Sequence, residues 1–445
     1  MSIYQDHLAK RQADESSAVE LIVALAKLTN KNVSVLFFGE CLSLSVADIL
    51  TKHTNAGLKV ADTLALAQSL DVSNTTIDLG QAIKADKTAD DFASGQEVPA
   101  TDVVLYGFGR IGRILARLLM SRPASDKGLQ LKAIVVRPAG EGDLAKRGSL
   151  LERDSVHGWF DGSVEIDTAN GGIIVGGRFI KVIYASDPSE VDYTAHGINN
   201  AIVIDNTGKW KDEAGLGKHL ASKGVKKVLL TAPAKGEIKN VVYGVNHDTI
   251  GSDSIVSAAS CTTNAITPTL KVLHDHYGIV NGHMETVHAF TNDQNLVDNH
   301  HKADRRGRAA PLNMVMTSTG AASAVSKAIP ELKGKLTGNA IRVPTPNVSL
   351  AILNLNFEKA VGSADELNAF IKDKSQSQQW QEQIDYSDSS EAVSTDFVGS
   401  KKVAIFDAKA TIATDNRATL YVWYDNEMGY STQVIRVAEV MANNS

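Results

Sequence analysis

The hydrophobic positions of the chain change their spacing near residue 100. Upstream of that point they recur at the helical interval, as in "SSAVELIVALAKL", where Val19, Ile22, Val23 and Leu25 are placed toward one side. "SLSVADILTKH" and "ADTLALAQSL" have the same spacing, whereas "NVSVLFF" favours a short strand. Residues 1–98 are therefore predicted to form a mainly helical N-terminal extension, which ends in the polar linker "KADKTADDFASGQEVPA".

Residues 99–260 alternate between short apolar runs and helical patterns. "VVLYGFGRIGRILARLLM" is a β run followed by a glycine turn and a helix. "LKAIVV", "RFIKVIY", "AIVIDNTG" and "KKVLLTAP" are further β-branched runs, and the helix-like "EAGLGKHLASKG" separates the last two. This alternation predicts an α/β domain built on a parallel sheet.

The predicted strands become longer after Cys261. "GHMETVHAFT", "AIRVPTPNVSLAILNLNF" and "KVAIFDAKATIATDNRATLYVWYD" favour a mostly antiparallel sheet, so residues 261–430 are predicted to form an α+β domain. "STQVIRVAEVMANN", within residues 431–445, predicts a closing amphipathic helix.

Composition excludes several classes of function. A net charge of −6 gives no electrostatic reason to expect nucleic acid or an anionic membrane as a partner. Cys41 and Cys261 are too few for a disulfide framework and lack the spacing of a metal site, so we expect no metal and a reducing compartment. The acidic N-terminus does not resemble a secretory signal, and no apolar run approaches the ~18 residues of a membrane span. We therefore expect a soluble, cytoplasmic protein.

The glycine turn has the spacing of a dinucleotide-binding motif. Gly107, Gly109 and Gly112 form G-x-G-x-x-G after a strand and before a helix, which is the context that gives this pattern meaning. The first glycine permits a tight turn, and the second lets the backbone approach a pyrophosphate at the helix N-terminus. The alternative is a glycine-rich βα turn that binds nothing. We expect a Rossmann domain that binds NAD or NADP.

The residue after the second strand leaves the choice of cofactor open. NAD-binding domains commonly place an acidic residue there to hold the ribose 2′-hydroxyl, but this chain has Arg137 followed by Pro138. Arginine pairs well with a 2′-phosphate, which favours NADP. Alternatively, Arg137 faces solvent and the cofactor is NAD.

Cys261 is a candidate nucleophile at the start of a predicted helix. The positive end of a helix dipole favours a thiolate, although Pro268 makes the helix start uncertain. A nucleophile also requires a base, and His288 lies on the next predicted strand. The alternatives are a small buried thiol and a structural histidine.

Several blocks resemble the phosphorylating glyceraldehyde-3-phosphate dehydrogenases. "SAASCTTN" with "TVHAFTNDQ" is similar to the active-site signature of that family. Further blocks follow in the order of the family across residues 102–445: "YGFGRIGR", "RDSVHG", "DNTGKW", "GVNHD", "RRGRAA", "TSTGAASAV", "ELKGKLTGNAIRVPTPNVSL" and "WYDNEMGYS".

The resemblance implies a reaction and an anion-binding set. Cys261 would attack the aldehyde of glyceraldehyde 3-phosphate, and His288 would assist the thiolate and take the hydroxyl proton as hydride leaves. Inorganic phosphate would then release 1,3-bisphosphoglycerate from the resulting thioester. The residues matched to the two phosphate positions are Ser260, Thr262, Thr291, Thr319, Gly320 and Arg342. The arginines of "RRGRAA" add positive charge near the site or form interface salt bridges.

The resemblance also implies cofactor contacts and an assembly. The residues matched to the cofactor are Arg110, Ile111, Thr207, Thr231 and Asn426, and Asn426 would hold the nicotinamide carboxamide. A homotetramer and a place in glycolysis or gluconeogenesis are implied, with the last helix packing back onto the Rossmann domain.

Departures from the family pattern keep alternatives open. Ala265 and Met428 replace a common cysteine and tryptophan, and Ser186 stands where an arginine often lies near the adenine. Erythrose-4-phosphate dehydrogenase, and a silent regulatory or scaffold member, are the competing functions. The extension of residues 1–98 is compatible with covering its own subunit, with assembly, or with binding a regulator.

Overall fold

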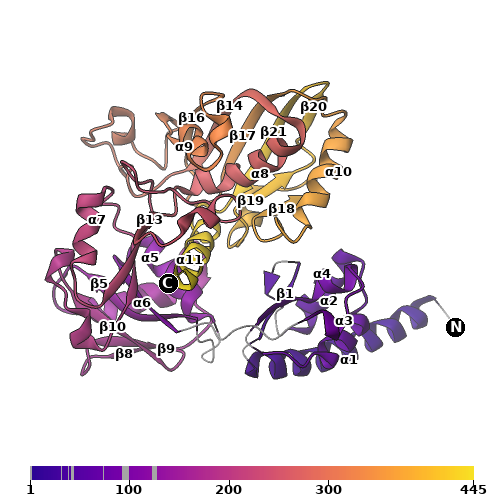
Figure 1. Cartoon of the computed structure of the whole chain (residues 1–445), viewed down its shortest axis with the longest axis horizontal. Coiled ribbons are helices and arrows are strands. Elements are labelled where there is room, and N and C mark those ends of the chain that lie inside the picture. Colours follow the sequence, from indigo (N-terminus) through magenta and orange to yellow (C-terminus); the bar gives the residue numbers. More distant parts are fainter. Residues whose placement is uncertain are drawn as a thin grey trace. The chain divides into compact units, whose positions relative to one another are not determined.

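The computed structural model describes residues 3–31, 33–38, 40–41, 45–73, 75–92, 100–122 and 128–444. The chain divides into two compact units, one formed by the described residues up to 92 and the other by those from 100 onward. Each unit is described by itself below, with the elements labelled in Figure 1. Gly95 and Pro99 of the predicted linker lie outside the described residues.

The first unit packs helices around a small sheet in the strand order β2-β1-β3. β1 pairs in parallel with β3 and antiparallel with β2. The helices are α1 (Ile3–Asn30), α2 (Val46–Ala56), α3 (Val60–Ser69) and α4 (Leu79–Lys84), and the strands are β1 (Val33–Phe37), β2 (Glu40–Cys41) and β3 (Thr75–Asp78).

The predicted helical character of this region is confirmed, but two details differ. The α1 helix begins at Ile3, well before the apolar stretch that predicted it, and β3 was not predicted. The face of α1 that packs inward carries Leu21, Leu25 and Leu28, whereas Val19 and Val23 are each 53% exposed. Residues at i, i+4 and i+7 share one stripe of a helix, and Val19 and Val23 lie on the opposite face, so the prediction that they share a side with Leu25 was wrong.

The second unit begins with an eight-stranded sheet in the order β13-β12-β11-β4-β5-β10-β9-β8. The six strands from β13 to β10 pair in parallel, and β9 and β8 add an antiparallel edge that the sequence did not reveal. The strands are β4 (Thr101–Tyr106), β5 (Leu129–Val136), β8 (Val164–Asp167), β9 (Gly172–Val175), β10 (Arg178–Tyr184), β11 (Ala201–Asp205), β12 (Val225–Leu230) and β13 (Ile255–Ser257), and a separate hairpin joins β6 (Arg153–Asp154) to β7 (Gly158–Trp159).

Helices cover this sheet and bury its apolar side chains. The helices in this part of the chain are α5 (Arg110–Met120), α6 (Asp143–Glu152) and α7 (Glu213–Leu220). The C-terminal helix α11 (Met428–Asn443) joins the same core through Val434, Val437 and Met441. The buried Lys227 of β12 donates to the carbonyls of Met441 and Asn444, so it satisfies acceptors at the end of α11.

A second sheet follows in the order β15-β16-β14-β17-β21-β19-β18, with β20 paired to β21. All pairings are antiparallel except β14 with β16 and β18 with β19. The strands are β14 (Ile279–Ala289), β15 (Val315–Ser318), β16 (Leu336–Val343), β17 (Ser349–Phe357), β18 (Ile384–Ser387), β19 (Ala404–Asp407), β20 (Ile412–Thr414) and β21 (Arg417–Tyr424), and the helices of this region are α8 (Cys261–Tyr277), α9 (Ala321–Ala328) and α10 (Ala364–Ser375).

These two sheets confirm the predicted fold class: a Rossmann-like parallel sheet, a mostly antiparallel second sheet and a helical N-terminal region. Figure 1 shows α11 returning from the second sheet toward the first, and α8 lying against β17 and β21. Within the described residues, no helix combines the length and the apolar character required to cross a membrane.

Candidate active site

Cys261 is the first residue of α8 and follows a constrained turn. Ala259 has a φ of 55°, a left-handed conformation that residues with a side chain rarely adopt. The Tyr430 hydroxyl donates to the Ala259 carbonyl at 3.0 Å and holds this turn. Ser260 is the N-cap, and its Oγ accepts from the Thr263 amide at 3.0 Å. The helix continues through Pro268, where the side chains on either side are buried. The turn therefore presents the Cys261 sulfur at the helix start.

The sulfur faces the imidazole of His288. Cys261 Sγ lies 3.6 Å from His288 Nε2, within the range of a sulfur hydrogen bond. His288 Nδ1 lies 2.7 Å from the Ala289 carbonyl oxygen, and a proton on Nδ1 would be donated there. That tautomer leaves the Nε2 lone pair directed at the sulfur, so His288 is placed as a base.

Arg342 completes this group from the neighbouring strand. Residues 288 and 342 are register partners on β14 and β16, and Arg342 Nη1 lies 3.0 Å from His288 Nδ1. The same Nη1 donates to the Ala289 carbonyl at 2.9 Å. The parallel pairing thus brings a guanidinium next to the cysteine–histidine pair.

Burial controls the protonation of this group. Burial and the Arg342 charge lower the pKa of His288 to about 3, so its imidazole is neutral at physiological pH. Burial also raises the pKa of the Cys261 thiol, although the Arg342 charge and a hydrogen bond with Thr262 act in the opposite direction. The direction of this shift is opposite to the one that the start of a helix favours for a thiol.

The predicted anion ligands lie at different places around the pair. Ser260 and Thr262 flank the nucleophile, and Thr262 Oγ1 also lies 3.0 Å from the Tyr424 hydroxyl. Thr291 follows the end of β14, two residues beyond Ala289. Thr319 and Gly320 follow β15. The β15 residue that pairs with Arg342 is Val315, at the far end of the strand from Thr319. The Thr319 hydroxyl accepts a hydrogen bond from the Ala321 amide. The roles of Thr291, Thr319 and Gly320 stay predictions.

The glycine turn has the backbone that a bound pyrophosphate requires. Gly107 has a φ of 104°, and a Cβ at Gly112 would stand 2.6 Å from the Gly107 carbonyl oxygen. A Cβ at Gly109, the N-cap of α5, would meet no atom within 4 Å, so this side of the turn is open. The turn is tight where strand and helix approach and open at the helix N-terminus, which fits a dinucleotide.

The two residues after Gly109 contribute differently. The Arg110 side chain forms ion pairs with Asp154 and Glu427, so the part of Arg110 left for a cofactor is its backbone amide. Ile111 packs against the core of the first sheet, which also leaves its amide at the helix start.

Thr207 and Thr231 both donate hydrogen bonds to Asp205, at the end of β11. Thr207 donates to the Asp205 carboxylate from its amide at 2.8 Å and from its hydroxyl at 2.7 Å. The Thr231 amide and hydroxyl donate to the Asp205 backbone carbonyl. The remaining carboxylate oxygen lies 3.0 Å from His219 Nε2 in a fully buried pair. Asp205 thus orients both loops at the carboxyl ends of β11 and β12.

Arg137 is exposed directly after the end of β5. Among the residues that the structure describes, its side chain has no recorded hydrogen bond or ion pair. The nearby acid Asp143 is already engaged, because Arg147 donates to it at 2.7 Å. The Asp143 carboxylate is therefore not free for a ribose 2′-hydroxyl, whereas the Arg137 guanidinium is exposed.

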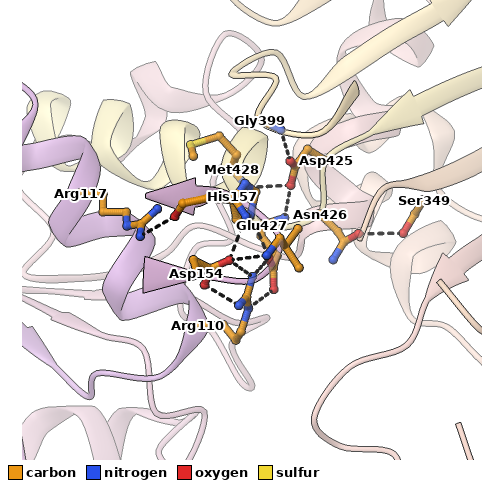
Figure 2. A network of polar contacts seen from close by, with 12 residues as sticks. Arg110, Arg117, Asp154, His157, Ser349, Gly399, Asp425, Asn426, Glu427 and Met428 are labelled. Atoms are coloured by element: carbon orange, nitrogen blue, oxygen red, sulfur yellow. Dashed lines mark hydrogen bonds and ion pairs between the residues drawn. The ribbon is translucent and has the colours of Figure 1, made fainter. Parts of the chain in front are cut away.

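Asn426 lies in a polar network that Figure 2 shows at close range. Its Oδ1 accepts from the Ser349 hydroxyl at 3.0 Å. Asp425 caps α11 by accepting from the amides of Glu427 and Met428, and its other oxygen accepts from the Gly399 amide. Glu427 accepts from Arg110, and His157 Nε2 lies 3.0 Å from the same carboxylate. Each neighbour of Asn426 is thus fixed by charge-assisted hydrogen bonds.

Several residues of the site were not predicted. Burial acts to raise the pKa of Glu427, but hydrogen bonds from Arg110 and His157 outweigh it and lower that pKa. Arg306, whose block "RRGRAA" was expected to add positive charge near the site or to form interface salt bridges, pairs with Asp293 at 2.5 Å, and its charge also acts on His288. Tyr424 is buried, and its hydroxyl lies within hydrogen-bond distance of the Thr262 and Thr286 hydroxyls. These residues lie within the quoted blocks, but their partners are distant in sequence.

Taken together, the fold and the site define a nicotinamide-dinucleotide-binding protein with a cysteine–histidine pair beside a guanidinium. Residues 101–213 match the NAD-binding domain, and residues 260–426 the C-terminal domain, of glyceraldehyde 3-phosphate dehydrogenase. The chain belongs to the glyceraldehyde-3-phosphate dehydrogenase family. The matched domain implies a cofactor of the NAD(P) class.

Individual relatives cover the chain to different extents. A glyceraldehyde-3-phosphate dehydrogenase-like protein of Pseudomonas aeruginosa (strain UCBPP-PA14) is 53% identical over 443 residues, spanning 93% of this chain and 96% of that protein. The glyceraldehyde-3-phosphate dehydrogenase of Zymomonas mobilis is 41% identical over 346 residues, spanning 77% of this chain and 99% of that protein. Glyceraldehyde-3-phosphate dehydrogenase A of Escherichia coli is 41% identical over 335 residues, spanning 75% and 96%. About 100 residues precede the matched NAD-binding domain here.

Proposed function

We propose that the protein catalyses the phosphorylating oxidation of glyceraldehyde 3-phosphate to 1,3-bisphosphoglycerate. The observation that carries this proposal is the 3.6 Å approach of Cys261 Sγ to His288 Nε2, with Arg342 beside the same imidazole. A nucleophile, a neutral base and a fixed cation are the groups that acyl transfer to a phosphate requires.

The residues act in two stages. Cys261 attacks the aldehyde carbon while His288 Nε2 takes the thiol proton and delivers it to the new oxyanion, which gives a thiohemiacetal. His288 then removes the hydroxyl proton as the carbon is oxidised, and a thioester remains on Cys261. Phosphate attacks the thioester carbon, the C–S bond breaks, and the sulfur regains its proton from His288. Arg342, Ser260 and Thr262 supply donors for the substrate and phosphate oxyanions.

The cofactor would be held by the glycine turn and by Asn426. A bound nicotinamide ring would accept the hydride that leaves the substrate carbon. The backbone of Gly107, Gly109, Arg110, Ile111 and Gly112 would face the pyrophosphate, and Thr207 and Thr231 would line the cofactor. We propose that Arg137 pairs with a ribose 2′-phosphate, so that NADP is accepted as well as NAD.

Initial rates with defined substrates test the activity. Glyceraldehyde 3-phosphate should be oxidised with NAD or NADP only when inorganic phosphate is present, and Cys261→Ser should abolish the reaction. Faster, phosphate-independent oxidation of erythrose 4-phosphate would favour that alternative. A folded wild-type protein that binds NAD but turns over neither substrate would favour the regulatory or scaffold function.

The homotetramer and the cytoplasmic location also stay proposals, and light scattering tests the homotetramer.

A further inference from the structure

Ser349 lies between the two parts of the candidate active site, namely the strand that carries His288 and the segment that carries Asn426. It is the first residue of β17, which lies between β14 and β21 in the second sheet. β14 carries His288 near its end, and β21 ends at Tyr424, two residues before Asn426. Ser349 is the register partner of Tyr424 and is only 1% exposed. The topology therefore places one buried hydroxyl between the catalytic histidine and the cofactor-binding asparagine.

The hydrogen bonds of Ser349 reach both parts. Its Oγ accepts from the amide of Ala289, the residue after His288, at 3.1 Å. The Ala289 carbonyl in turn accepts from Arg342, so both backbone polar groups of Ala289 are engaged. The Ser349 hydroxyl proton is directed at Asn426 Oδ1, at 3.0 Å.

The backbone before Ser349 is strained. Val348 has a φ of 64°, and the left-handed region is unfavourable for a β-branched residue. Val348 is also buried, so surrounding packing holds this conformation. Such strain is commonly found where a functional geometry is over-determined by its surroundings. Here the strained residue is the one that delivers the Ser349 hydroxyl to its partners.

We propose that Ser349 is a positioning residue that sets the amide orientation of Asn426, an inference that rests on the proposed function. With Oδ1 held by the Ser349 hydroxyl, the Asn426 NH₂ group is left to donate to a ligand. Figure 2 shows the amide nitrogen on the side away from Ser349. Asn426 then donates to the carbonyl oxygen of the nicotinamide carboxamide and does not accept from its NH₂ group.

A cofactor analogue distinguishes the two amide orientations without measuring turnover. In 3-acetylpyridine adenine dinucleotide a methyl ketone replaces the carboxamide, so the carbonyl oxygen remains and the NH₂ group is lost. Dissociation constants for NAD and this analogue can be compared by calorimetry. The wild-type protein should bind both within about threefold, because an unaltered hydrogen bond leaves the free energy of binding nearly unchanged.

Ser349→Ala removes the group that orients the amide. Asn426 can then rotate and accept from the carboxamide NH₂, which only NAD offers. We expect the affinity for the analogue to fall about tenfold, equivalent to ~1.4 kcal/mol, and the affinity for NAD to fall less. Ser349→Cys, a closer match in size with a weak donor, should give a smaller change of the same kind. This variant keeps the test decisive if Ser349→Ala does not fold.

Ser431→Ala is the matched control, because Ser431 is buried in α11 and its hydroxyl has no hydrogen-bond partner among the described residues. It should leave both dissociation constants unchanged. The proposal is overturned if the wild-type protein already prefers NAD by tenfold or more, or if Ser349→Ala weakens both ligands equally or neither. A folded wild-type protein that binds neither NAD nor NADP would instead overturn the proposed function.

Discussion

Arg110 and Glu427 are joined by two hydrogen bonds, of 2.7 and 2.5 Å, although 317 positions separate them in the chain. Arg110 is the first residue of α5, directly after Gly109, and Glu427 directly precedes α11 and follows Asn426. The pair therefore links the glycine turn to the segment that carries Asn426 (Figure 2). The hydrogen bonds that Arg110 donates to Glu427, opposed by burial, raise the pKa of Arg110, so the guanidinium stays charged.

Glu427→Gln tests this link. The substitution keeps the shape but removes the negative charge that Arg110 and His157 face, and charge-assisted hydrogen bonds contribute about 1.5–3 kcal/mol. We expect the free energy of unfolding to fall by about 1–3 kcal/mol in urea titrations, and the affinity for NAD to weaken. A double-mutant cycle with Arg110→Gln should show coupling. Additive effects of the two substitutions would contradict the link.

His288→Asn tests the role of the neutral imidazole as a base. Removing a general base typically slows a reaction by about 10²–10⁴-fold, and we expect kcat to fall within that range. Calorimetric binding of NAD should be unchanged, because the substitution leaves the glycine turn intact. His283→Asn, on the same strand but with a partly exposed side chain, is the control and should retain wild-type rates. Loss of activity in both variants would point to damage of β14 instead.

Arg137→Ala tests the choice of cofactor. If the guanidinium pairs with the 2′-phosphate, kcat/KM with NADP should fall about tenfold or more, corresponding to ~1.4 kcal/mol, while the value with NAD stays the same. Lys146→Ala removes an exposed positive charge from α6 and should change neither value. A wild-type enzyme that uses NAD alone, with Arg137→Ala indistinguishable from it, would show that Arg137 only faces solvent.

Acidification should destabilise the N-terminal unit through His53. Burial, opposed by a hydrogen bond with the Ile49 carbonyl, lowers the pKa of His53. Below the unfolded pKa of about 6.5, the unfolded state binds a proton that the folded state resists. The contribution of His53 to the free energy of unfolding is therefore complete above pH 6.5, and it is lost as the pH falls toward the lowered pKa of the folded state.

Two spectroscopic signals separate this unit from the rest of the chain. The four tryptophans, Trp159, Trp210, Trp380 and Trp423, lie beyond residue 100, so their fluorescence follows the second unit, whereas far-ultraviolet circular dichroism follows both. Between pH 7.5 and 5.5 we expect the dichroism transition of the first unit to move to lower temperature. His53→Gln should reduce this pH dependence, and the exposed His7→Gln should not. An equal response in all three proteins would rule out His53 as the cause.

Local sequence patterns predicted much of the candidate active site. Cys261 was predicted at the start of a helix, although Pro268 left that start uncertain, and the structure shows Ser260 as the N-cap. G-x-G-x-x-G predicted the turn because glycine alone tolerates its conformation and close contacts. The pairing of Cys261 with His288 was anticipated from a motif on the next strand. Ser349 and Glu427 carried no such signal, because a serine at a strand start and a glutamate before a helix are ordinary residues until their partners are known.

The order of residues alone determined much of the succession of strands, turns and helices, although not β3, β8 or β9, since hydrophobic spacing and glycine chemistry act over a few positions. Only the packed structure decided which charges meet, which stripe of α1 is buried, and that Cys261 Sγ lies 3.6 Å from His288 Nε2. The burial of a side chain and the pairing of its charge depend on contacts between segments that are distant in sequence. Removal from water shifts the pKa of a group such as His288, and it gives weight to the hydrogen bonds of a buried hydroxyl such as that of Ser349.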